Sequence, residues 1–202
     1  MSLISNFIYK SSSPILAWYV SEVTLLVLVL LSFKVIVIIF FKLKRHGFEH
    51  NNDTSMGYDE VLLIIGLGAI YLFELYSIIA VINNGINGIS EYILLTILFL
   101  SITESTLQSV LIIYCLKLYT NDKELKKLKP ARSLITALIL IDISIWLNET
   151  FCAKKYDMNK IELDYYNIVF WSIVSSISSP LAIFFHFHAS VCLTDIWKDL
   201  YE

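Results

Sequence analysis

The chain has 202 residues, of which 57% are hydrophobic and only 16% are charged, and its mean hydropathy is +0.70. These values exclude an ordinary soluble domain of this length and predict an integral membrane protein. The formal net charge of -3 gives no support for nucleic-acid binding.

Five long apolar stretches follow one another along the chain, separated by short polar breaks. Each is about as long as the ~20 residues that a helix needs to cross a hydrocarbon layer roughly 30 Å thick. The sequence therefore predicts an all-α, polytopic membrane bundle in a single domain, residues 1–202. The predicted spans, in chain order, are Pro14–Phe41, Val61–Ile82, Tyr92–Leu118, Ser133–Phe151 and Asn167–Leu193.

The two ends of the chain are predicted to lie on opposite sides of the membrane. Residues 1–13 lack the charged start and the small-residue cleavage site of a signal peptide, so we expect the first span to remain in the mature protein. Lys and Arg are concentrated in residues 42–60, in residues 117–132 and in the C-terminal tail. Because such connections usually face the cytosol, we expect the N-terminus outside and the C-terminus inside.

Ionisable side chains occur in the middle of several apolar stretches. On insertion scales a charge at bilayer depth costs about 2.5–3.5 kcal/mol, so such a group usually faces a partner or water. These groups are therefore the main indication of function. The side chains that need an explanation are Glu22, Lys34, Glu74, Glu104, Asp142, Glu149, His186 and His188.

The second and third spans carry features of helix packing. Gly66 and Gly68 give the second span a small-residue face that lets another helix approach closely. In the third span, Glu104 and Gln108 are four residues apart and so share one helix face. That face can supply hydrogen bonds between helices, although a carboxylate is a costly means to this end, or it can belong to a proton pathway.

The fourth span places Asp142, Trp146 and Glu149 on a second stripe at helical spacing. The simplest interpretation of Glu149 is a solvated group at the membrane edge. The three cysteines lie in or beside apolar stretches without metal-ligand spacing, so we interpret them as small buried hydrophobic residues and expect no metal site. They are Cys115, Cys152 and Cys192.

The fifth span combines a helix-kinking proline, Pro180, with His186 and His188. The two histidines are two positions apart and point to different faces, so at most one can face a given polar pathway. A histidine titrates near neutrality and can accept and return a proton.

These motifs resemble those of a known family. Residues 180–188, Pro-Leu-Ala-Ile-Phe-Phe-His-Phe-His, and residues 191–197, Val-Cys-Leu-Thr-Asp-Ile-Trp, closely resemble the last transmembrane helix and tail of the otopetrins, which are proton-selective channels. Residues 106–108 and 143–151 resemble the family's tenth and eleventh helices. On this alignment the chain covers helices eight to twelve of a subunit that has two similar six-helix halves and forms homodimers.

The resemblance also implies functional residues. Otopetrin halves place a Gln, an Asn or Asp, and a Tyr at an intramembrane constriction. Gln108 matches the first, Asp142 falls where the C-terminal half usually has Asn, and Phe185 stands where the family has Tyr. His186 replaces an Arg, whereas His188 matches the family's histidine. The implied proton pathway comprises Glu104, Gln108, Asp142, Phe185 and His188, with Glu74, Glu149 and His186 as additional candidates.

The sequence thus predicts passive proton conduction across the plasma membrane, without a cofactor, because a proton needs only hydrogen-bonding groups and water. The expected partners are protons, the lipid bilayer, and a second copy or a full-length otopetrin-like subunit. The alternative is a non-conducting partner that assembles with full-length subunits and modulates them. An enzyme is not expected, since no nucleophile with an oriented base, no metal-ligand cluster and no phosphate-binding glycine loop is evident.

Overall fold

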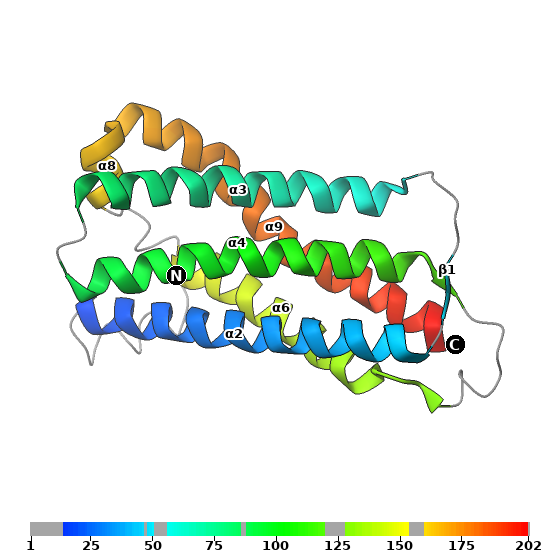
Figure 1. Ribbon diagram of the computed structural model, residues 1–202. Helices are drawn as coiled ribbons and strands as arrows, with labels where there is room; N and C mark the ends of the chain where they lie inside the picture. Colours follow the sequence, from blue (N-terminus) through cyan, green and yellow to red (C-terminus); the bar gives the residue numbers. More distant parts are fainter. Residues whose placement is uncertain are drawn as a thin grey trace.

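The computed structural model describes residues 14–46, 48–50, 56–85, 88–119, 128–153 and 160–201. Figure 1 shows its long helices arranged as one bundle. Each of them contains a stretch long and apolar enough to cross a membrane, so the predicted five-helix membrane bundle is confirmed. The long helices are α2 (Pro14–His46), α3 (Tyr58–Asn84), α4 (Ile89–Leu116), α6 (Arg132–Asn148) and α9 (Ile168–Tyr201).

Shorter elements join the long helices at the two ends of the bundle. At one end, α6 continues into the π-helical turn η1 (Glu149–Ala153), and α8 (Lys160–Tyr166) precedes α9. At the other end, β1 (Glu49–His50) pairs antiparallel with β2 (Leu118–Tyr119). The Tyr119 hydroxyl donates a hydrogen bond to the Glu49 carboxylate, which raises the pKa of Tyr119 because the bond favours the neutral phenol.

The long helices extend beyond several of the predicted spans. Helix α2 ends at His46, five residues after Phe41, and α9 continues to Tyr201 instead of ending at Leu193. The last turns of α9 are amphipathic: Ile196 and Leu200 are buried, whereas Lys198 is exposed. Because only one face of these turns is apolar, a continuous apolar stretch does not mark the C-terminal end of α9. Helix α8 was not predicted.

Helix α9 packs against α3, α6 and α4, whereas α2 packs against α4 and α6. Helix α9 contacts α3 and α6 most extensively and crosses the bundle obliquely (Figure 1). It lies close to α3 at Gly66, where an added Cβ would lie 3.1 Å from the Cβ and 3.3 Å from the Cα of Phe185. Nothing lies within 4 Å of a Cβ added at Gly68. Of the two glycines in α3, only Gly66 therefore lies at a close helix contact.

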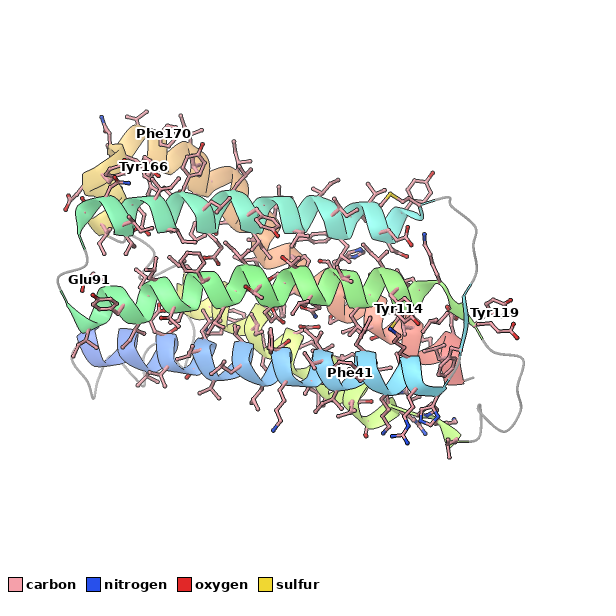
Figure 2. All side chains as sticks on the ribbon, viewed as in Figure 1. Phe41, Glu91, Tyr114, Tyr119, Tyr166 and Phe170 are labelled. Carbon is pink, nitrogen blue, oxygen red and sulfur yellow. The ribbon has the colours of Figure 1, made fainter. Side chains whose placement is uncertain are left out.

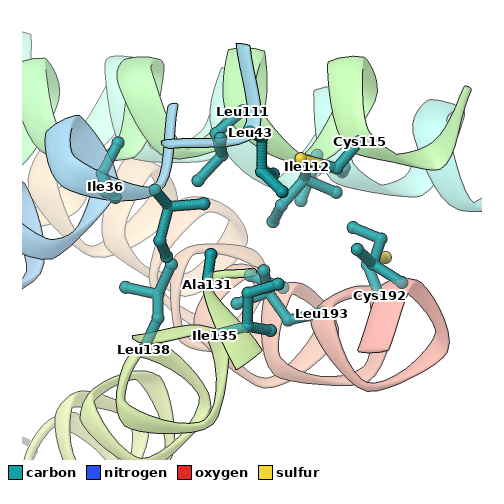
Figure 3. Close-up of a cluster of buried hydrophobic side chains, with 14 of the residues drawn as sticks. Ile36, Leu43, Leu111, Ile112, Cys115, Ala131, Ile135, Leu138, Cys192 and Leu193 are labelled. Atoms are coloured by element: carbon teal, nitrogen blue, oxygen red, sulfur yellow. The ribbon is translucent and has the colours of Figure 1, made fainter. Parts of the chain in front are cut away.

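The end of the bundle that holds β1 and β2 is filled by apolar side chains. Figure 3 shows this cluster, to which α2, α4, α6 and α9 all contribute. Its labelled members are Ile36, Leu43, Leu111, Ile112, Cys115, Ala131, Ile135, Leu138, Cys192 and Leu193. A guanidinium contact closes this end, since the Arg132 carbon Cζ lies 4.6 Å from the centroid of the Trp197 ring.

The outer surface of the bundle suits a lipid environment. Along α2 the exposed side chains are largely aliphatic, and in a bilayer they contact acyl chains. Aromatic side chains gather towards both ends: Figure 2 shows Tyr166 and Phe170 at one end and Tyr114 and Tyr119 near the other. Amphipathic rings prefer the headgroup level, so these two groups are consistent with the two membrane interfaces.

Candidate functional site

Helix α4 buries a row of polar side chains in the centre of the bundle. Glu104, Ser105 and Gln108 are completely buried, and Ser109 is 2% exposed. Polar groups in an apolar interior are costly unless they form hydrogen bonds, so their partners on other helices define this region.

The Glu104 carboxylate is held by two hydroxyl groups. Ser32 on α2 donates a short hydrogen bond to Oε1, and Ser105 donates to Oε2 over 3.4 Å. The carboxylate therefore joins α2 to α4 at the centre of the bundle. Ser32 is itself completely buried, so this contact is shielded from bulk solvent.

Gln108 continues the polar contacts from α4 to α6. Its Nε2 donates to Asp142 Oδ2 over 2.6 Å, and Asp142 is completely buried. The remaining oxygens, Gln108 Oε1 and Asp142 Oδ1, have no hydrogen-bond partner among the described residues. Asp142 Oδ1 is thus an acceptor available to a further polar group.

His186 on α9 lies between two carboxylates. Its Nδ1 is 4.0 Å from Asp142 Oδ1, and its Nε2 is 3.9 Å from Glu149 Oε1. Both distances are somewhat too long for direct hydrogen bonds, so the imidazole is a close neighbour of both acids without a direct bond to either. An imidazole with one nitrogen towards each acid can pass a proton from one side to the other.

Together these residues form a buried polar row that crosses the bundle: Ser32, Glu104, Gln108, Asp142, His186 and Glu149. Its Glu149 end is partly open, since the Glu149 side chain is 24% exposed. A cavity of about 130 Å³, with room for several water molecules, adjoins this end and is also lined by His186. Four carboxylates, those of Glu22, Glu74, Glu149 and Glu162, lie in its wall.

A hydrophobic layer closes the opposite side of the polar row. On α2 and α6 the next buried positions towards the β1–β2 end are apolar, whereas on α4 and α9 the buried polar residues Ser109, His188 and Ser190 lie among the apolar ones. This layer consists of Ile36 and Ile39 on α2, Leu111 and Ile112 on α4, Ile135 and Leu138 on α6, and Ala189 and Leu193 on α9. The polar row therefore adjoins the cavity on one side and a mainly apolar cluster on the other.

The remaining predicted site residues lie around the row. Glu74 is in the cavity wall, where its Oε1 accepts a hydrogen bond from Ser101 over 3.0 Å. Phe185 is completely buried, and its ring packs edge-on against that of His186, with the ring centroids 5.2 Å apart. His188 lies apart, with its Nε2 3.1 Å from the backbone carbonyl of Asp59 on α3.

Sequence reasoning did not name Ser32 or Glu162. It placed His188 in the proton pathway and His186 among the additional candidates, and the structure brings His186, and not His188, beside Asp142. The chain contained one signal for Ser32, a hydroxyl in the middle of an apolar stretch. No sequence signal indicates that Ser32 lies opposite Glu104, which is 72 residues away along the chain.

Comparison with known proteins finds one family model and related proteins that agree with it. The family model described as Otopetrin matches residues 1–187. Over its whole length the chain is 29% identical to the proton channel OtopLc of Drosophila melanogaster, and it covers 13% of that protein. It is 22% identical to the mouse proton channel OTOP2, in an alignment that includes 79% of the chain and 38% of that protein. The chain therefore spans well under half the length of these relatives.

Proposed function

Since the chain belongs to the otopetrin family and is a multi-pass membrane protein, we propose that it forms a passive proton pathway, or part of one, across the plasma membrane. The observation that supports this most directly is the buried polar row from Glu149 to Glu104. In this row, carboxylates, an imidazole and an amide from several helices lie one after another in space inside an apolar bundle. Such groups accept and release protons without any wide aqueous pore.

In the proposed pathway, protons are concentrated by the acidic wall of the cavity. Glu149 and His186 then exchange a proton through water, and His186 passes it to Asp142. Asp142 and Glu104 are the carboxylates that carry it deeper, with Gln108 holding Asp142 in place. No cofactor has a role in this sequence of steps.

The test of this function is proton flux into liposomes that contain the purified chain and a trapped pH-sensitive dye. We expect an imposed proton gradient, with valinomycin and potassium to balance charge, to dissipate several-fold faster than in protein-free liposomes of the same lipid. In liposomes without valinomycin, the chain should leave a potassium gradient in place. Dissipation no faster than in the protein-free liposomes would contradict conduction by this chain.

A second function is the non-conducting partner that assembles with another subunit, and Lys34 favours it. Lys34 is exposed on α2, eight residues before Lys42, which is about 12 Å along the helix. A cation at that depth on the outer surface is costly in lipid, and a helix of a second copy or of a full-length otopetrin-like subunit would cover it. In the liposome assay, such a partner gives no flux alone but changes the flux of a full-length otopetrin reconstituted with it.

We further propose that the N-terminus and the cavity face outwards and the C-terminus faces the cytosol. This orientation is supported by the basic last turn of α2, which contains Lys44 and Arg45. An N-terminal epitope tag should bind antibody on intact cells, whereas a C-terminal tag should bind only after permeabilisation. The reverse pattern, or glycan on Asn52, which lies outside the described residues, would contradict the orientation.

A further inference from the structure

A separate cluster of metal-ligating side chains lies between α3 and α9, away from the buried polar row. His188 and Cys192 are one turn apart on α9, and Asp59 is in the first turn of α3. His188 Nε2 is 3.6 Å from Cys192 Sγ and 4.0 Å from Asp59 Oδ1. All three potential ligand atoms lie within 4.8 Å of one another.

We propose that Asp59, His188 and Cys192 form a binding site for a divalent transition-metal ion, with Zn²⁺ as the best match. Imidazole nitrogen, thiolate sulfur and carboxylate oxygen are the ligands that zinc uses in proteins. With bonds of about 2.0 Å to nitrogen and 2.3 Å to sulfur, tetrahedral geometry requires a separation of about 3.5 Å between these two atoms. The observed separation of His188 Nε2 and Cys192 Sγ is 3.6 Å.

Two of the ligands are held in place by their surroundings. Cys192 is 1% exposed, and the His188 ring stacks on Phe184 with a centroid distance of 5.3 Å. The burial of Cys192 and the stacking of His188 restrict both side chains, so little rotamer freedom is left to lose on binding a metal. The competing partner of His188 Nε2 is the Asp59 backbone carbonyl, 3.1 Å away. Metal binding requires the Nδ1–H tautomer and replaces this hydrogen bond.

The third ligand, Asp59, lies at the surface, where its side chain can move and an ion can reach it. The Asp59 side chain is 57% exposed, so its carboxylate can rotate to shorten the 4.0 Å separation, and an ion can enter from the aqueous side. The adjacent acid, Glu60, is engaged elsewhere, since its Oε1 lies 3.8 Å from Lys117 Nζ. A water molecule completes the four ligands. On binding, the Cys192 thiol loses its proton to solvent, and no electron is transferred.

A bound ion would connect α3 to α9 beside the hydrophobic layer. Cys192 belongs to the same apolar cluster as Cys115 (Figure 3), so the site lies at the end of the bundle that is closed to the cavity. The proposal does not depend on proton conduction, because its three ligands lie outside the buried polar row and it has a spectroscopic readout.

The test is a titration of the purified, reduced chain in lipid nanodiscs with Co²⁺, which is a coloured substitute for Zn²⁺. We expect about one equivalent of Co²⁺ to produce a thiolate-to-cobalt charge-transfer band and tetrahedral d–d bands, and Zn²⁺ to remove them. Cys192→Ser should abolish the charge-transfer band. Asp59→Asn and His188→Gln should each weaken Co²⁺ binding at least ten-fold.

Cys115→Ser is the matched control, because Cys115 is also a buried cysteine of that cluster but is not one of the three ligands. It should keep both bands. Absence of a charge-transfer band in the unchanged chain, its persistence in Cys192→Ser, or unaltered affinity in Asp59→Asn would overturn the proposal. Asp59→Asn alters an exposed side chain, so it provides a decisive result even if a core variant fails to fold.

Discussion

Replacing Asp142 with asparagine is expected to lower proton flux through the reconstituted chain at least ten-fold. Asparagine keeps the size of the side chain and can still accept the hydrogen bond from Gln108. It removes the carboxylate that faces His186, so the row loses a group that holds the proton between the imidazole and the rest of the row. A ten-fold loss corresponds to about 1.4 kcal/mol on the barrier. The liposome assay measures it directly.

The matched control for this substitution is Asp195→Asn, which changes the same group at an exposed position of α9. Asp195 Oδ1 lies 3.6 Å from Lys198 Nζ, and its side chain is 49% exposed. We expect flux through this variant to equal that of the unchanged chain. Flux through Asp142→Asn that is unchanged or larger would mean that only hydrogen bonding, and no titratable group, is needed at that position.

Replacing Gly66 with leucine is expected to destabilise the bundle strongly. A single added Cβ already lies 3.1 Å from the Cβ of Phe185 and 3.3 Å from its backbone Cα, so α3 and α9 must move apart to accept a larger side chain. Overpacking of this kind costs about 1–3 kcal/mol, and occasionally more. A lower melting temperature of the purified protein in detergent, or a higher fraction of aggregate on size-exclusion chromatography, would measure this loss.

Gly68→Leu is the control for that prediction, because it adds the same side chain to the same helix two residues further on. Gly68 is exposed, and nothing lies within 4 Å of an added Cβ. Any loss or gain of helix propensity is shared by the two variants, so their difference isolates the contact with α9. Equal stability of the two variants would show that α9 adjusts to the larger side chain without cost.

The five spanning helices were predictable because each one is a long run of apolar residues, which is a local property of the chain. The short helix α8 has seven residues and no apolar run of spanning length, so the same criterion could not find it. The extension of α9 was missed because its last turns bury only one face, as Ile196 and Leu200 show.

The candidate site was predictable only where its parts lie on one helix. Helical spacing alone placed Glu104 and Gln108 on a shared face, and it separated His186 from His188. Which histidine meets Asp142 depends on the rotation of α9 about its axis, and packing of Phe185 against Gly66 contributes to that rotation. The proposed metal site was missed for the same reason, since Asp59 and His188 are 129 residues apart along the chain.

Because of the hydrophobic layer, the buried polar row adjoins the cavity on one side only. On the proposed pathway, His186 exchanges protons with the cavity and Asp142 does so through His186, while Ile36, Leu111 and Leu138 lie between them and the opposite end of the bundle. Their occupancy by protons is then an equilibrium property of one compartment, independent of the acidity of the other. Transfer of a proton across the hydrophobic layer is a separate and rarer event, because it requires water to enter the layer. The same residues can thus bind and release protons on the cavity side many times for each proton that crosses the layer.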